Sequence, residues 1–279
     1  MSENPASPRS DAQEDLMARV DTSVPVSARI WNYWMGGSDY YPVDKAAGDA
    51  YATLSPGVFE LASSARAFLV RAVRYTAADL GVRQFLDCGS GLPSHSPTHE
   101  VAQGAAPGSR VVYVDHDPLV LAHARALLES NPSGGTDYIE ADLYKPTALL
   151  DVARTKLDFS QPIAIMLMGV MGHIGNPFQD DDRVGRSIVE AMKDALPSGG
   201  YFVMYEGINT DPAQNEALAA YNASGAIPYH VREPAQVLRF FEGLELVDPG
   251  VVPIHQWHPD PGTVDPPAVP ALGGIGRKP

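Results

Sequence analysis

Cysteine is almost absent from this chain, because Cys88 is the single cysteine among 279 residues. An internal disulfide is therefore impossible, and nothing points to an oxidising compartment. A run of 18 apolar residues is also missing, which argues against a membrane span. No apolar segment follows a basic start at the N-terminus, so we expect no secretory signal. These absences predict a cytoplasmic protein without a membrane partner.

Basic residues are scarce as well: 20 Lys and Arg stand against 34 Asp and Glu, for a formal net charge of −14. Such a field repels nucleic acid, so we expect no nucleic-acid partner. His255 and His258 have no cysteine or carboxylate cluster beside them, and we therefore predict no metal site. The expected partner is a small-molecule substrate, and the sequence leaves the oligomeric state open, a homodimer included.

Polar residues and prolines dominate residues 1–22, which we expect to form a disordered acidic tail. Apolar residues then recur at helical spacing over residues 23–80. Helices are expected there at 24–35, 42–54 and 56–80, and they would make an N-terminal helical cap.

The pattern changes in residues 81–279, where short apolar runs alternate with helical segments. This alternation predicts an α/β fold with a mostly parallel sheet covered by helices on both faces. The expected strands are 84–88, 110–115, 136–140, 163–168 and 201–205, and the expected helices are 99–103, 118–130, 147–154, 180–196 and 234–241. Two further apolar segments, 244–247 and 251–257, are expected to form a hairpin near the end.

Acidic residues lie at the ends of three successive strands of this predicted sheet. Asp87 leads into Gly89-Ser90-Gly91, a turn in which glycines allow close approach of a ligand to the backbone. Asp115 ends the next strand, where a carboxylate binds ribose hydroxyls. Asp142 ends the third, where it suits an adenine amino group while Leu143 packs on the ring. Together they favour an adenosine ligand over a set of ordinary loop turns.

The type of adenosine ligand follows from what this turn lacks. A dinucleotide site requires a third glycine, but Pro93 follows Gly91-Leu92 instead. No Gly-x-x-x-x-Gly-Lys-Ser/Thr loop is present, so an ATP-type site is unsupported. A ligand without phosphate fits better, and this points to S-adenosylmethionine as the cofactor.

Several longer motifs resemble a known family. They are Ala28-Arg29-Ile30-Trp31-Asn32-Tyr33 with Gly36-Gly37, Arg66-Ala67-Phe68-Leu69-Val70-Arg71, Gly91-Leu92-Pro93, Val112-Tyr113-Val114-Asp115 and Gly274-Ile275-Gly276-Arg277-Lys278. The chain resembles the actinobacterial S-adenosyl methyltransferase family, formerly a domain of unknown function. The resemblance implies a class I methyltransferase fold, Rossmann-like, with a seven-stranded sheet, one antiparallel strand and an N-terminal helical cap. It also implies methyl transfer to a small-molecule acceptor, for which we expect a secondary metabolite.

The candidate cofactor contacts come from these turns, strand ends and motifs. They are Tyr33, Gly36, Arg66, Asp87, Gly89, Ser90, Gly91, Asp115, His116, Asp142, Leu143 and Gly169. An aromatic face such as that of Tyr33 attracts a sulfonium, although the ring can equally be part of a packed helix. Arg66, at the place of a family arginine, suits the methionine carboxylate, with an ordinary surface arginine as the alternative.

The candidate catalytic residues are His173, Glu206 and Tyr33. His173 could act as a general base or could simply bond a backbone carbonyl. Glu206 could be the base, bind an acceptor amine, or be a solvated loop carboxylate. The sequence departs from the family pattern at Ser38, Gly172 and Glu206, which face the substrate in this fold, so the acceptor is expected to be unusual.

Two other functions remain open at this point. An enzyme that cyclises or cleaves S-adenosylmethionine itself would use the same cofactor site. A non-catalytic sensor would bind the cofactor without turnover. Products separate the three: S-adenosylhomocysteine, methylthioadenosine, or neither.

Overall fold

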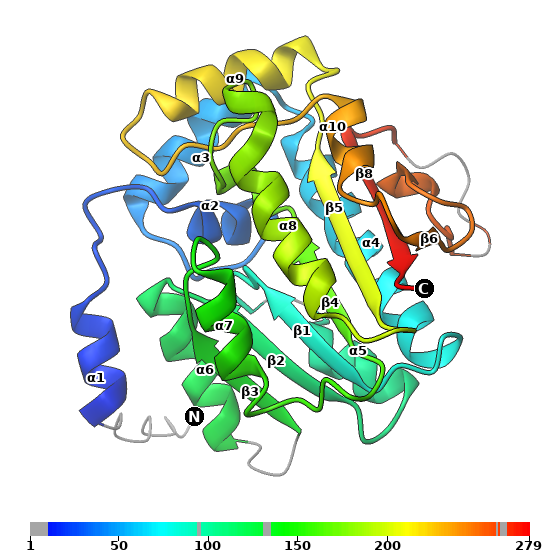
Figure 1. The fold of residues 1–279 in the computed structure, drawn as a ribbon. Coiled ribbons are helices and arrows are strands. Elements are labelled where there is room, and N and C mark those ends of the chain that lie inside the picture. Colours follow the sequence, from blue (N-terminus) through cyan, green and yellow to red (C-terminus); the bar gives the residue numbers. More distant parts are fainter. Residues whose placement is uncertain (1–10, 94–95, 131–134, 261, 263–266) are drawn as a thin grey trace.

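A central sheet organises the computed structural model, which describes residues 11–93, 96–130, 135–260, 262 and 267–279 (Figure 1). The strands are β1 (Gln84–Cys88), β2 (Arg110–Asp115), β3 (Thr136–Glu140), β4 (Ala164–Met168), β5 (Tyr201–Gly207), β6 (Glu245–Leu246), β7 (Val252–Pro253) and β8 (Ala271–Arg277). Their order is β3-β2-β1-β4-β5-β8-β6, with β7 also paired to β8. The first five strands pair in parallel and β8 runs antiparallel to β5, as expected for a class I methyltransferase fold.

The sheet has eight strands instead of the expected seven. The additional strand arises because the outermost strand is interrupted and is divided into β6 and β7. β6 and β7 both pair with the edge of β8 that β5 leaves free. Between Glu245↔Arg277 and Val252↔Gly273 the outer chain advances seven residues while β8 advances four, so three residues bulge outward. The expected hairpin between these segments is therefore wrong, because each pairs with β8 and not with the other.

The helices follow the predicted order, with two additions. They are α1 (Asp11–Ala18), α2 (Ser27–Trp34), α3 (Pro42–Leu54), α4 (Val58–Ala78), α5 (Thr98–Ala105), α6 (Pro118–Ser130), α7 (Pro146–Ala153), α8 (Arg183–Ala195), α9 (Pro212–Asn222) and α10 (Pro234–Arg239). Short 3₁₀ turns are η1 (Met171–His173), η2 (Asp180–Asp182) and η3 (Ile254–Gln256). No helix in these described stretches is long and apolar enough to cross a membrane.

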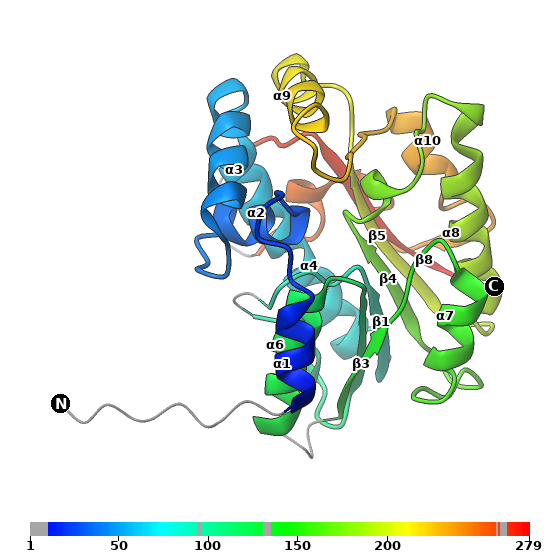
Figure 2. The same cartoon turned by 90° about the vertical axis from the view of Figure 1, so that its left-hand side faces the viewer.

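The prediction of a disordered tail over residues 1–22 is wrong in part, because α1 forms a helix within this range. Leu16 is buried there against Leu121 and Ala122 of α6, which explains why the segment is ordered despite its polar composition. Figure 2 shows α1 lying along α6. Residues 1–10 of that tail lie outside the described residues.

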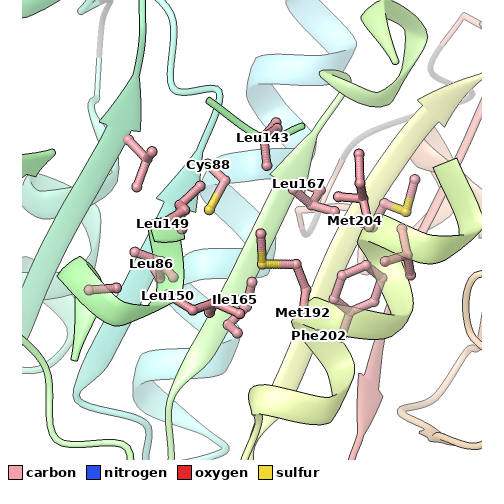
Figure 3. Close-up of a cluster of buried hydrophobic side chains, with 14 of the residues drawn as sticks. Leu86, Cys88, Leu143, Leu149, Leu150, Ile165, Leu167, Met192, Phe202 and Met204 are labelled. Atoms are coloured by element: carbon pink, nitrogen blue, oxygen red, sulfur yellow. The ribbon is translucent and has the colours of Figure 1, made fainter. Parts of the chain in front are cut away.

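Two hydrophobic layers sandwich the sheet because neighbouring residues of each strand face opposite sides. Leu86 and Ile165 join the cluster with α7 and α8, whose packing Figure 3 shows. Phe85 and Met166 join the other cluster with α4 and α5. The residues of β1 are all buried, and those of β4 are buried up to Leu167, because helices cover both faces of these central strands.

A third group of helices lies over the carboxyl ends of the strands. Figures 1 and 2 show α2, α3 and α9 together at this end. The sequence did not predict α9, whose many alanines leave only a weak contrast between its apolar and polar faces. Their cluster includes Ile30, Tyr51, Leu218 and Tyr221. By contrast, α4 packs on the sheet, so the cap that stands apart consists of α2, α3 and α9. The boundaries at residues 22 and 80 otherwise stay predictions.

Candidate active site

A pocket of about 770 Å³ opens at the carboxyl ends of the parallel strands. Its size is within the range of ordinary ligand sites, and this end of an open α/β sheet is where ligands bind. The loops after β1, β2, β3 and β4 form one side, and α2 and α4 form the other. Eleven of the predicted residues line it: Arg66, Asp87, Gly89, Ser90, Gly91, Asp115, His116, Asp142, Leu143, Gly169 and His173.

Of the buried polar atoms in this pocket that have no hydrogen-bond partner in the structure, three belong to predicted site residues. They are Oδ1 of Asp87, Oγ of Ser90 and Nε of Arg66. The other carboxylate oxygen of Asp87 accepts a hydrogen bond from Thr98 at 2.7 Å. Burial raises the pKa of Asp87 to about 6. Arg66 is not the surface residue considered as its alternative, because burial lowers the pKa of its guanidinium. A carboxylate and a guanidinium with unused hydrogen-bonding atoms thus lie together, as a ligand carrying an ammonium and a carboxylate requires.

Asp115 organises the turn around it. Its Oδ2 accepts from the Gly91 N–H at 2.9 Å, and Oδ1 accepts from the N–H groups of His116 and Asp117 at 2.7 and 3.0 Å. Three of about four acceptor positions of the carboxylate are therefore used by the backbone. The remaining acceptor position, on Oδ2, can receive a ribose hydroxyl, so binding of both ribose hydroxyls by Asp115 stays a prediction.

Asp142 and Leu143 occupy the third strand end, with different environments. Asp142 is exposed, and its Oδ1 accepts from the Tyr144 N–H at 2.9 Å. Leu143 is buried and belongs to the core beneath the pocket. The free oxygen of Asp142 can still accept a hydrogen bond from an adenine amino group beside an apolar wall.

Two glycines of the pocket have conformations that exclude a side chain. Gly89 has φ +72°, and a Cβ there would overlap Val170. Gly169 has φ +73°, and a Cβ there would lie 2.7 Å from the Tyr205 hydroxyl. Both turns need glycine because φ is positive and a side chain, of Val170 or Tyr205, lies against the backbone at the pocket wall.

His173 is held in one tautomer at the side of the pocket towards the cap. Its Nδ1 lies 3.0 Å from the Pro228 carbonyl, which can only accept, so Nδ1 carries the proton. Nε2 then accepts from the Ser27 hydroxyl at 2.8 Å. Burial lowers the pKa of His173, which keeps the ring neutral near pH 7. His173 therefore bonds a carbonyl, as one interpretation expected, while its role as a general base stays a prediction, with Nε2 reaching the pocket through the Ser27 hydroxyl.

Glu206 lies behind the pocket and does not line it. Its Oε1 accepts from the Tyr229 hydroxyl at 2.6 Å and from the Gly207 N–H at 3.1 Å. The side chain is fully buried, which raises its pKa, so the solvated loop carboxylate considered earlier is wrong. Tyr229 stands between Glu206 and the pocket and fills the space where a Cβ at Gly172 would be. Glu206 therefore positions Tyr229.

Tyr33 and Gly36 do not line the pocket. The residues of α2 that line the pocket are Ser27, Ala28, Arg29 and Trp31, with Met35 just after the helix, and Tyr33 is not among them. The Tyr33 hydroxyl instead bonds Asp49 of α3. Gly36 has φ +77° and ends α2, with its N–H donated to the Tyr33 carbonyl. We leave both out of the site for this reason.

Sequence reasoning missed the residues on the cap side of the pocket. Ser27, Trp31 and Tyr229 line it, and Pro228 orients His173. These residues come from a helix near the N-terminus and a loop about 200 positions later, so no local spacing links them. The sequence did contain one indication of them: the helical period of α2 places Ser27 and Trp31, four residues apart, on one face of the helix.

The described residues contain no group of three or more His, Cys, Asp or Glu side chains arranged to hold a metal ion.

Comparison with known proteins gives the family. A family model described as S-adenosyl methyltransferase matches residues 13–279. The chain belongs to this family. The protein is therefore an enzyme that uses S-adenosylmethionine as its methyl donor, as the resemblance implied. No curated protein matches it.

Two solved structures are close to this methyltransferase over nearly the whole chain. A candidate methyltransferase from Thermobifida fusca YX is 40% identical, with a TM-score of 0.84, and the match covers 92% of this chain and 96% of the other. A DUF574 family protein from Streptomyces avermitilis is 41% identical, with a TM-score of 0.86 and coverage of 94% and 100%. An O-methyltransferase family protein from Burkholderia thailandensis shares the fold at 12% identity, with a TM-score of 0.52 and coverage of 95% and 69%.

Proposed function

We propose that this methyltransferase transfers a methyl group from S-adenosylmethionine to a hydroxyl of a small-molecule acceptor. The observation that carries the proposal is the pairing of two features in one pocket. Unpartnered polar atoms of Asp87, Ser90 and Arg66 lie at one end, and the neutral His173, whose Nε2 accepts from the Ser27 hydroxyl, lies at the other. The first end can bind the amino acid part of the donor, and the second can remove a proton from the acceptor.

The residues present fit the donor. Asp87 would hold the ammonium and Arg66 the carboxylate of its methionine part, because both have buried atoms without a partner. Asp115 would bind the ribose and Asp142 the adenine amino group. The donor supplies an electrophilic methyl group on a sulfonium. The chain's contribution is to align the acceptor oxygen with that carbon and to exclude water.

His173 would receive the proton through Ser27. The Ser27 hydroxyl donates to Nε2, so its own oxygen can accept from an acceptor hydroxyl. As the acceptor oxygen takes up the methyl group and the donor's sulfur leaves, the acceptor's proton would move to Oγ of Ser27 and the Ser27 proton would move to Nε2 of His173. The lowered pKa of His173 keeps it able to accept near pH 7.

The rival uses of the cofactor are less well supported by the site. A sensor would not need a neutral histidine with a fixed tautomer beside the cofactor pocket. An enzyme that consumes the cofactor alone would not need the space that continues beyond His173 towards Trp31 and Tyr229. A cytoplasmic location and a secondary-metabolite acceptor remain part of the proposal.

The test is product analysis together with binding. Calorimetry should show S-adenosylhomocysteine binding and no comparable binding of NAD or ATP. The protein incubated with S-adenosylmethionine alone should leave it intact, whereas a library of hydroxylated small molecules should yield S-adenosylhomocysteine. Methylthioadenosine formed without any acceptor would overturn the proposal.

A further inference from the structure

A second, smaller cavity adjoins the main pocket on its cap side. Its volume is about 60 Å³, and it lies between α2, α3 and α9 of the cap and the ends of β5 and β8. Four residues border both spaces: Ser27, Trp31, Tyr205 and Tyr229. The lining beyond them is mostly apolar, with Ile30, Val58, Leu61, Leu218 and Ala271.

One polar group in this cavity has no partner. Tyr221 of α9 lines it, is more than nine-tenths buried, and its hydroxyl makes no hydrogen bond. The hydroxyl of Ser27 is close by and donates to His173, but its geometry towards the Tyr221 hydroxyl is not that of a hydrogen bond. Burial raises the pKa of Tyr221 to about 12, so it stays a neutral hydroxyl. A buried hydroxyl left unpaired is costly, which indicates that a ligand atom satisfies it.

The border between the two spaces has the composition of a ring-binding site. Three of its four residues are aromatic, and the fourth, Ser27, is bonded to the base His173. A neutral imidazole removes a proton from a phenol, with a pKa near 10 as in tyrosine, far more readily than from an alcohol. A ring lying between Trp31, Tyr205 and Tyr229 would direct one substituent to Ser27 and the opposite one into the second cavity.

We infer that the second cavity receives the para substituent of a phenol whose hydroxyl is methylated beside Ser27. The volume sets the length of that substituent. A cavity of about 150 Å³ holds the six carbons of benzene, so about 60 Å³ holds two or three. The Tyr221 hydroxyl favours a substituent that carries a polar atom at its end. This inference rests on the proposed function and names its substrate class.

A series of phenols tests the length. The protein is first saturated with S-adenosylhomocysteine, and binding of phenol, 4-methylphenol, 4-ethylphenol, 4-propylphenol and 4-butylphenol is then measured by calorimetry. We expect affinity to rise about fourfold for each carbon up to ethyl or propyl, since each buried methylene stabilises by roughly 0.8 kcal/mol. It should fall at butyl. Affinity that is independent of length, or that still rises at butyl, overturns the inference.

Substitutions separate the cavity from the rest of the site. Ala271→Val adds two carbons to the cavity wall and should weaken 4-ethylphenol at least tenfold while leaving phenol unchanged. Leu61→Phe repeats the experiment should the strand variant fail to fold. Ala52→Val makes the same change in α3 at a residue that lines neither space, and should alter neither ligand. Equal effects of Ala271→Val on phenol and 4-ethylphenol would contradict the assignment.

The unpaired hydroxyl has its own test. Tyr221→Phe should weaken 4-(2-hydroxyethyl)phenol about fivefold and leave 4-ethylphenol unchanged, because only the first can bond Tyr221. Unchanged binding of both would remove the polar end of the substrate from the inference. Failure of S-adenosylhomocysteine to bind overturns the proposed function, whereas its binding together with no response to any phenol overturns this inference alone.

Discussion

The two ends of the pocket are built in different ways. At the cofactor end, Asp87, Asp115 and Asp142 each lie at the carboxyl end of a parallel strand of one sheet, and backbone N–H groups hold Asp115. At the acceptor end, Ser27, His173 and Tyr229 come from separate segments, and side chains hold one another. The cofactor end follows from the sheet, whereas the acceptor end depends on how the cap lies on the sheet.

Buried contacts within the cap therefore decide whether the acceptor end exists. Asp44 of α3 is fully buried and accepts from the N–H groups of Val26 and Tyr41, both at 2.8 Å. Its Oδ1 also lies 3.5 Å from Nε of the buried Arg29, which lines the pocket. One carboxylate thus fixes the start of α2 to the start of α3.

The largest effect we expect is from Asp44→Ala. It leaves the Arg29 charge and two N–H groups buried without their partner, so the free energy of unfolding should fall by about 3–5 kcal/mol. Chemical denaturation measures this. Amide exchange should also quicken in α2 and α3 more than in β1 and β2. Equal loosening of the sheet would show that the two ends are one unit and would break the comparison.

The matched control for Asp44→Ala is Asp49→Ala on the same helix. Asp49 is an exposed carboxylate that pairs with Lys45 at 2.6 Å. Exposed pairs contribute little, so its loss should change stability by less than about 1 kcal/mol.

The next largest effect concerns the cofactor end. Asp115→Ala should weaken S-adenosylhomocysteine roughly 100-fold in calorimetry, because it removes a ribose acceptor and the anchor of three N–H groups. The control is Asp137→Ala, a carboxylate on β3 that pairs with Lys156 away from the pocket. Unchanged affinity in Asp115→Ala would mean that Asp115 only shapes the turn.

The difference between the two ends also explains what the sequence could predict. Asp87, Gly89 and Asp115 were found because a strand, a turn and an acidic residue are adjacent in the chain, so local pattern carries the geometry. The core strands were found for the same reason. The broken β6–β7 edge was not, because a three-residue bulge leaves no mark on apolar alternation.

At the acceptor end, local pattern was a poor guide. The aromatic face of Tyr33 predicts a contact with the cofactor, yet Trp31, two residues before it on α2, lines the pocket and Tyr33 does not. Glu206 was chosen because it follows a strand, but it faces Tyr229, a residue from a later loop. Such contacts depend on tertiary packing between distant segments, which no short-range spacing encodes.

The pH dependence of cofactor binding comes next in size. Asp87 has a pKa of about 6 in the protein and must be ionised to pair with an ammonium. Affinity for S-adenosylhomocysteine should be constant above pH 7 and should fall about tenfold per unit below pH 6. Asp87→Asn should bind weakly at every pH and remove this slope. A wild-type affinity that does not change with pH down to pH 5 would show that the ammonium of the ligand does not bind Asp87.

The same raised pKa has an effect of opposite sign on stability. The native protein holds a proton on Asp87 between about pH 4 and 6, where the unfolded chain has lost it. The stability contribution of this group therefore decreases as pH rises through that window. Asp87→Asn should remove the decrease, so at pH 8 it should melt no lower than the wild type while binding the cofactor less well.

The smallest effect tests the link between cap and base. Ser27→Ala removes the hydroxyl that donates to Nε2 of His173, a bond that stabilises the neutral ring. The pKa of His173 should therefore rise by about 0.5–1 unit, the equivalent of one neutral hydrogen bond. Nitrogen NMR of the imidazole measures both this pKa and the tautomer, which the Pro228 carbonyl should keep at Nδ1–H. Affinity for S-adenosylhomocysteine should stay within about twofold of the wild type. An unchanged pKa would mean that the cap lies beside the base without acting on it, and the two ends of the pocket would then differ in construction alone.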